Sequence, residues 1–477
     1  MPTTIVNKNV PLVHRKEFQM MTPTPSVTTS GNVVISDPIG KDPLTLFVPA
    51  ATVAYFYNDD EDSYVQVASP ALGSAIGAGS CGARSRWSTT ITANGGSTTS
   101  ATTATAITGQ CLGQKIRFLS GANIGLEATI TGIIISPIGS GTQTIQFAAL
   151  PNAVANADTF TIDTGRFFVL ASSTLTATSF RIYDPLLGTW TSGTNTGLAA
   201  TWGTDGRLIS TPSNQSFATG TATAGSAGGS GTTITNSGKA WTTNQWANCQ
   251  IRITSGAGIG QIRNITSNTG TVITVSAAWT TTVDATSVYS IEGNDDYLYL
   301  MGNGAVTLYR YSISGNTWTT LSPTAARASV TGAGMTGEWI GKTGDANWAL
   351  ETAIQDGRYI YSFAGGAGSA LHRYDIALNT WQTITYYPVA ETLTTGTGST
   401  WYGKNIYIRK DATNRYFKYD VVANSLKPFA TNLYTDSTAM VGNKTWIKTY
   451  DESGTDKIVW VYSLLNTLTP LHRIMVI

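Results

Sequence analysis

The chain has 477 residues, of which only 12% are charged, and its net charge is +1. A nucleic-acid-binding protein needs clustered positive charge, so a chain this close to neutral excludes that class. Its 41% hydrophobic and 10% aromatic residues give it enough apolar surface to bury, which excludes a disordered protein. Abundant Thr, Val, Ile, Tyr and Trp, separated by 49 Gly, are typical of short strands joined by turns, so we predict an all-β fold.

The N-terminal segment, residues 1–32, is polar and Pro-containing and repeats nowhere else, so we predict an extended arm. It is either disordered alone or adds a strand to the sheet edge of a neighbouring subunit. It lacks the apolar core of a signal peptide, and no run in the chain reaches the about 18 apolar residues of a membrane span. Cys81, Cys111 and Cys249 are too few for a disulfide framework and favour a reduced protein, with a Cys81–Cys111 pair as the alternative.

A short pattern recurs along the rest of the chain. It consists of an apolar strand, a turn, a second apolar strand that often ends in Tyr-Asp, a polar turn and a closing large side chain. The copies span residues 42–64, 165–190, 295–318, 356–381, 403–426 and 442–468.

The spacing of the copies predicts their architecture. Corresponding tyrosines at Tyr311, Tyr374, Tyr419 and Tyr462 lie 63, 45 and 43 residues apart. A strand-only repeat of this length is typical of β-propeller blades, each a four-stranded antiparallel sheet. We therefore predict a propeller of six blades, with five or seven as alternatives, and we expect it to comprise residues 33–72, 164–217 and 293–477.

Three copies place a Trp seven residues after the Tyr, at Tyr183–Trp190, Tyr311–Trp318 and Tyr374–Trp381. This spacing resembles that of kelch repeats. The last two copies depart from it, because Leu426 and Leu468 take the place of the Trp. The resemblance implies a kelch-like propeller, and we expect each closing side chain to pack between neighbouring blades.

Two Gly/Ser/Thr-rich insertions, residues 73–163 and 218–292, interrupt the regular spacing. They match each other, because "KIRFLSGANIGLEATITG" at 115–132 aligns with "QIRITSGAGIGQIRNITS" at 250–267. We therefore predict two related β-modules. Each precedes a similar blade strand, and equivalent loops of a propeller open on the same face, so both modules should project from one face. Loops on a rigid scaffold are where recognition usually takes place.

The turn that the two insertions share contains Gly121, Gly125, Gly256 and Gly260, which we expect to adopt positive φ angles. A phosphate-binding glycine loop is the alternative interpretation. It would need a following helix and a Lys-Ser or Lys-Thr pair directly after the glycines, and neither follows this turn in the sequence.

The second insertion resembles a module of structural proteins of tailed bacteriophages over residues 221–291, and the first resembles it more loosely. The most specific stretch is "IRITSGAGIGQIR" at 251–263. The resemblance implies a non-enzymatic virion protein, assembled in the host cytoplasm, that docks to other virion proteins as a homo-oligomeric ring. We expect a position in the tail, at the tube end, nozzle or fibre attachment, with capsid or neck decoration as the alternative. We expect the interaction surface to include Arg117, Asn123, Arg252, Arg263, Trp241, Trp246 and Trp279.

The sequence contains no convincing catalytic or metal-binding set. His372 and His472 each lie between a Leu and an Arg, and we expect both on strands at blade edges. A copper oxidase of the galactose-oxidase kind needs two His and two Tyr together, and a glycosidase needs two well-spaced carboxylates. We predict no enzymatic activity, no cofactor and no metal site.

A rival hypothesis is a carbohydrate-binding propeller that recognises host surface glycans. Its aromatic platforms would be Trp202, Trp241, Trp246 and Trp279.

Overall fold

The computed structural model describes residues 18–20, 33–35, 45–58, 63–76, 80–85, 87–135, 142–171, 175–198, 207–210, 216–225, 231–301, 307–325, 327, 336–339, 359–363, 369–385, 398–402, 405–410, 415–421, 423–431, 445–451, 457–464 and 471–476. Within these ranges the protein is all-β, as predicted. The described part contains no α-helix and one short 3-10 turn, η1 (Gly109–Cys111).

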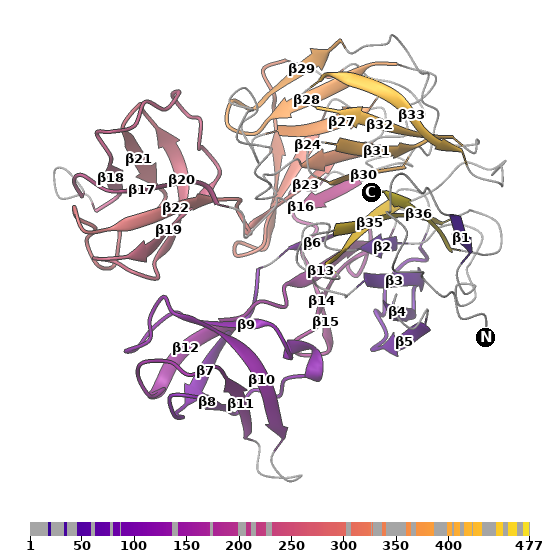
Figure 1. Ribbon diagram of the computed structural model, residues 1–477. Helices are drawn as coiled ribbons and strands as arrows, with labels where there is room; N and C mark the ends of the chain where they lie inside the picture. The colour runs from indigo at the N-terminus through magenta and orange to yellow at the C-terminus, as the bar shows by residue number, and fades with distance from the viewer. Residues whose placement is uncertain are drawn as a thin grey trace, which may run out of the picture.

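Six of the sheets are four-stranded and antiparallel (Figure 1). The first contains β2 (Val33–Ile35), β3 (Thr45–Ala50), β4 (Val53–Asn58) and β5 (Ser63–Val67). The second contains β6 (Cys81–Ser85), β13 (Arg166–Leu170), β14 (Phe180–Asp184) and β15 (Thr189–Ser192). The third contains β16 (Arg207–Ser210), β23 (Tyr297–Met301), β24 (Leu308–Ser312) and β25 (Thr317–Leu321).

The remaining three follow the same order. The fourth contains β26 (Thr336–Trp339), β27 (Tyr359–Phe363), β28 (Leu371–Asp375) and β29 (Thr380–Ile384). The fifth contains β30 (Gly398–Tyr402), β31 (Asn405–Arg409), β32 (Arg415–Asp420) and β33 (Ser425–Thr431). The sixth contains β34 (Thr445–Asp451), β35 (Lys457–Leu464), β36 (Leu471–Val476) and β1 (Phe18–Met20).

Neighbouring sheets contact one another through their first strands. Contacts join β2 to β6, β6 to β16, β16 to β26, β26 to β30 and β30 to β34, and β34 in turn contacts β2. Sheets that meet in this way through one strand each are typical of β-propellers.

The Tyr-Asp pair of the repeat forms the turn between the third and fourth strands. Asp375 Oδ1 accepts hydrogen bonds from the backbone N–H groups of Ala377 and Leu378, at 3.0 and 3.1 Å. The hydroxyl of Tyr374 donates to Asn379 Oδ1 at 2.7 Å, and Asn379 has a φ of +49°. An aspartate that accepts from the next turn and an Asn in the left-handed region are both frequent in turns. The pair is therefore a structural element of the blade.

The turn Asn was missed in the sequence, although it recurs five residues after the Tyr in three copies. Tyr311 bonds Asn316 and Tyr419 bonds Asn424 in the same way, at 2.7 and 2.8 Å. Asn424 also donates to the backbone oxygen of Thr385 in the preceding sheet, at 2.7 Å. This Asn thus links each turn to the neighbouring sheet.

The closing side chains pack between sheets, as expected. Trp318 on β25 is buried against Phe180 of the preceding sheet, with ring centroids 5.3 Å apart, and its indole N–H donates to Thr194 O at 3.0 Å. Leu426 lies in one core cluster with residues of β27, and Trp381 in one with residues of β23. These contacts fill the space between consecutive sheets.

The sixth sheet differs from the repeat predicted for it. Tyr462 lies on β35, the second strand of the sheet, whereas Tyr311, Tyr374 and Tyr419 lie on third strands. The true third strand is β36, and its Leu-His-Arg start matches the start of β28. In the sequence, the second strand of this sheet was aligned with the third strands of the other copies, because second and third strands share the same apolar pattern. Leu468, expected as the closing residue, lies outside the described residues.

The fourth strand of the sixth sheet comes from the N-terminal arm. In β1, Phe18 pairs with Ile474 and Met20 with His472 of β36. This part of the arm therefore adds a strand to a sheet of its own chain, where a free arm or a neighbouring subunit's sheet was expected. The rest of residues 1–32 lies outside the described part.

His372, expected at a blade edge, instead lies buried on β28, which pairs on both sides with β27 and β29. Its Nδ1 is 3.3 Å from Thr383 Oγ1, and the buried guanidinium of Arg327 bonds Ser362 nearby. Burial, and then the charge of Arg327, lowers the pKa of His372 from 6.5 to about 4. The fold therefore favours the neutral imidazole.

Acid should destabilise the protein through His372. Above pH 6.5 the imidazole is neutral in both states; between pH 6.5 and about 4 the unfolded chain binds one more proton than the folded chain. The free energy of unfolding then falls by up to about 1.4 kcal/mol per pH unit. In urea titrations at pH 7.5 and 5.0, His372→Leu should lose less stability than the wild type. An equal loss in both proteins would contradict this assignment.

Candidate functional site

The two inserted modules have the same strand order. Module 1 is a six-stranded sheet of β7 (Thr90–Asn94), β12 (Asn156–Ile162), β9 (Lys115–Phe118), β10 (Glu127–Ile135), β11 (Gln143–Phe147) and β8 (Ser100–Thr103). Module 2 is a sheet of β17 (Ser216–Thr221), β22 (Val288–Glu292), β19 (Gln250–Ser255), β20 (Ile262–Asn268), β21 (Val272–Val275) and β18 (Thr233–Thr235). A register shift falls at Thr131 in module 1 and at the equivalent Thr266 in module 2. The modules are two copies of one unit, down to this irregularity.

Both modules leave the sheets at the same place. Module 1 separates β6 from β13 and module 2 separates β16 from β23, which are the first and second strands of consecutive sheets. Because strands alternate in direction, this end of a sheet also carries its Tyr-Asp turn. Figure 1 shows both modules on one side of the four-stranded sheets. The strand β6 lies inside the range 73–163 that was expected to form module 1.

The Tyr-Asp turns anchor the modules. In module 1, Thr108 donates its backbone N–H to Leu186 O and its hydroxyl to Pro185 O, at 2.8 and 2.7 Å. In module 2, Asn248 donates to Ile376 O at 3.0 Å and accepts from Arg310 at 2.9 Å. Each module is thus fixed to a turn of the repeat.

The shared Ser-Gly-Ala-x-Ile-Gly turns of the two modules contact each other. A methyl group built at Gly125 would lie 2.7 Å from Ile259 Cγ1 and 3.1 Å from Gly260 N. The reverse also holds, because a methyl group at Gly260 would lie 2.8 Å from Ile124 Cγ1 and 3.0 Å from Gly125 N. Each isoleucine therefore covers the glycine of the other copy, as in a two-fold symmetric dimer interface. We call the two joined modules the crown.

The glycines of this turn adopt the expected conformation. Gly121, Gly125, Gly256 and Gly260 have φ angles of +79°, +78°, +77° and +83°. At Gly125 and Gly260 the close approach of the opposite backbone is a second reason for glycine, which the sequence did not reveal.

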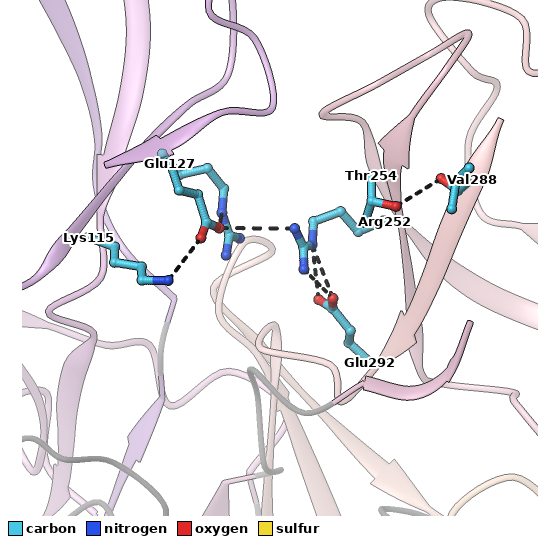
Figure 2. A network of polar contacts seen from close by, with 7 residues as sticks. Lys115, Glu127, Arg252, Thr254, Val288 and Glu292 are labelled. Atoms are coloured by element: carbon cyan, nitrogen blue, oxygen red, sulfur yellow. Dashed lines mark hydrogen bonds and ion pairs between the residues drawn. The ribbon is translucent and has the colours of Figure 1, made fainter. Parts of the chain in front are cut away.

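Figure 2 shows ion pairs at the junction of the modules. Arg117 Nε lies 2.6 Å from Glu127 Oε1, and Lys115 Nζ lies 3.6 Å from Glu127 Oε2. Across the junction, Arg252 Nη1 lies 4.0 Å from Glu127 Oε1, while its Nη2 bonds Glu292 Oε1 at 2.5 Å. Glu127 is therefore shared between the modules.

Opposite charges outweigh burial at this junction. Burial raises the pKa of Glu127, but Arg117, and then Arg252 and Lys115, hold it below its usual value. Burial likewise lowers the pKa of Arg252, but Glu292 and Glu127 raise it overall. Both groups are therefore ionised at neutral pH.

Replacing Arg252 by Met should destabilise module 2 strongly. Glu292 is only 4% exposed and would lose its hydrogen-bonded cation, a change that costs about 3–5 kcal/mol in proteins. The double change Arg252→Met with Glu292→Leu removes both charges and should recover most of the loss in urea unfolding. An equally large loss in the double variant would show that packing, not charge, dominates.

A cavity of about 590 Å³ lies between the modules and the third sheet. Module 1 contributes side chains of β9, including Lys115 and Arg117. Module 2 contributes Gln250 and the first residues of β20, and the third sheet contributes Asp295 and Ser314 from its loops. Both modules of the crown therefore contribute to its walls.

The residues expected on the interaction surface separate into two groups. Arg117 and Arg263 line the cavity, and Arg252 belongs to the ion-pair network beside it. Arg263 donates to Ala278 O at 3.1 Å and lies over the ring of Trp279 at 5.6 Å.

The other four expected residues serve the modules' own structure. Asn123 is fully buried and bonds the backbone of Asn152. Trp246 and Trp279 are buried in the core of module 2, and the half-buried Trp241 packs against that core. The expectation that Asn123, Trp246 and Trp279 form an exposed surface was wrong, because these short modules use them as core. Trp202 lies outside the described residues.

Sequence reasoning missed Glu127, Gln250 and Trp87. Gln250 and Lys115 occupy equivalent positions in the aligned motif, which was the available signal. Glu127 has no counterpart in module 2, where Ile262 takes its place. Trp87 lies before the first strand of module 1 and belongs to no copy of the repeat, so no pattern in the sequence pointed to it.

The described residues contain no group of three His, Cys, Asp or Glu side chains placed to hold a metal ion. Among the same residues no helix is long and apolar enough to cross a membrane. Cys81, Cys111 and Cys249 are buried and form no disulfide, so Cys81 and Cys111 are not paired.

No protein-family model and no curated protein sequence matches the chain. Solved structures resemble it at low similarity. The crystal structure of the mitotic checkpoint complex includes a chain that is 10% identical, with a TM-score of 0.36, over 98% of this chain and 94% of that one. Saccharomyces cerevisiae Sqt1 is also 10% identical, with a TM-score of 0.32 over 94% and 96%.

Proposed function

We propose that the chain is a non-enzymatic structural component of a tailed-phage virion that acts by docking to other virion proteins. We further propose that its six four-stranded sheets form a closed kelch-like propeller that presents the crown. The observation that carries the proposal is the reciprocal contact of Gly125 with Ile259 and of Gly260 with Ile124. It holds two copies of one module in a fixed relation on one side of the sheets.

A fixed crown suits docking better than catalysis. Its ionic side chains are used within the crown, since Arg117 and Arg252 bond Glu127 and Glu292. Pre-organised surfaces lose little entropy when they bind a partner. The resemblance of residues 221–291 to virion modules supports another virion protein as the partner. We further propose a position in the tail, as part of a symmetric ring.

Cryo-electron microscopy of purified particles that encode this chain tests the proposal. We expect density for the six sheets and the crown in several symmetric copies at the tail, with the crown in contact with a neighbouring protein. Copies on the head would support the decoration alternative. Absence of the chain from mature particles would contradict a structural role.

A further inference from the structure

The cavity beneath the crown has the dimensions and walls of a small-molecule site. Its volume of about 590 Å³ falls within the range of ligand pockets in proteins. It lies between module 1, module 2 and the third sheet, and ligand sites frequently form at such junctions. The chemistry of its walls identifies the class of ligand.

The charges of the lining exclude a polyanion. Three cationic side chains and four carboxylates face the cavity. Arg117 is 2.6 Å from Glu127, and Arg263 is bonded to the carbonyls of Ala278 and Ile262. No excess of positive charge is left for a phosphate-rich ligand, which would require one. The lining therefore argues against a negatively charged ligand.

Gln250 is the residue placed to form hydrogen bonds with such a ligand. It lines the cavity and is only 5% exposed. Its side-chain amide is not one of the fully buried polar groups that lack a partner, and it faces the cavity. The amide supplies both a donor and an acceptor to a molecule in the cavity.

Trp87 gives the cavity an apolar wall. Its indole packs against the core between the second and third sheets and also lines the cavity. A ligand that contacts both Trp87 and Gln250 needs a flat apolar face and a hydroxyl-bearing edge. A sugar ring combines the two.

The walls offer little to a peptide backbone. The lining strands β9, β19 and β20 are each hydrogen-bonded to a neighbouring strand on both sides. None of them can therefore add an extended peptide as a further strand. We propose that this cavity binds a short neutral oligosaccharide, with Gln250 as its hydrogen-bonding residue and Trp87 as its stacking residue.

The intact chain should be tested on an array of neutral oligosaccharides, and the best binder measured by calorimetry. Gln250→Met keeps the length of the side chain and removes the amide, so we expect about a tenfold loss of affinity. Gln66 is an exposed glutamine on β5, in another sheet, and Gln66→Met should bind like the wild type. Trp87→Leu should also weaken binding, and an unchanged thermal melting curve of Gln250→Met keeps the test independent of folding.

Two results would overturn the proposal. The first is that no neutral oligosaccharide on the array binds, or that Gln250→Met binds the best one as tightly as the wild type does. The second is that a peptide from a random library binds to the wild type but not to Gln250→Met, while no saccharide binds to either protein.

Discussion

Replacing Gly125 by alanine should separate the two modules of the crown. The new methyl group would lie 2.7 Å from Ile259 Cγ1 and 3.1 Å from Gly260 N, so the docked turns would have to move apart to admit it. We expect small-angle scattering to show a larger radius of gyration and proteases to cleave the module junctions faster. The combined change Gly125→Ala and Gly260→Ala should have a larger effect, since each glycine is in contact with the isoleucine of the other module.

Gly113 provides a matched control in the same module. Its φ of +78° equals that of Gly125, but a methyl group there would meet nothing within 4 Å. Gly113→Ala therefore introduces the same backbone strain, about 1–2 kcal/mol, without the crowding. Separation of the modules in Gly113→Ala as well would show that backbone strain alone is responsible, and would remove the turn contact as the cause.

Trp318→Ala should cost about 3–5 kcal/mol of stability, as usual for the loss of a large buried aromatic side chain. Trp318 is 4% exposed and lies in one core cluster with residues of the second and third sheets. Its ring is 5.0 Å from that of Tyr311, and its indole N–H bond to Thr194 joins the two sheets. Urea unfolding should therefore shift to clearly lower concentrations.

Trp190 is the natural comparison for this change. It occupies the same repeat position and its indole donates to Ala68 O at 2.8 Å, but its side chain is only half-buried. Trp190→Ala should cost about 1–2 kcal/mol, in proportion to the smaller area it buries. If both variants lost equal stability, the hydrogen bond to the preceding sheet rather than burial would be decisive.

The repeat could be predicted because its chemistry is local. Tyr311 and Trp318 lie seven residues apart and pair directly across β24 and β25. Spacing along the chain therefore carries their relation. The sixth sheet could not be predicted in the same way, because its last strand, β1, comes from the other end of the chain.

The modules could be recognised as copies, but their docking could not be predicted. Positive φ at Gly125 follows from the turn itself, whereas its contact with Ile259 depends on where two separate sheets place their insertions. The burial of Asn123, Trp246 and Trp279 was missed for a related reason. A polar or aromatic residue in a short, Gly-rich module has few apolar neighbours in sequence, and its burial depends on contacts between strands far apart in the chain.

The crown links the two functional proposals. A fixed arrangement of modules 1 and 2 presents one surface to a partner protein. The same arrangement forms the walls of the cavity that Gln250 lines. A variant that separates the modules should therefore weaken saccharide binding, while Gln250→Met should leave docking to a virion partner intact.

The distance between the modules tests the account most directly. Thr131 and Thr266 are exposed and occupy equivalent positions in the two copies, so cysteines there can carry spin labels. Burial raises the pKa of Cys81 to about 12 and that of Cys111 to about 11, and Cys249 is buried, so the native thiols react slowly. Pulsed electron resonance should give one narrow distance distribution, which broadens in Gly125→Ala. A broad distribution in the otherwise unchanged protein would contradict a fixed crown.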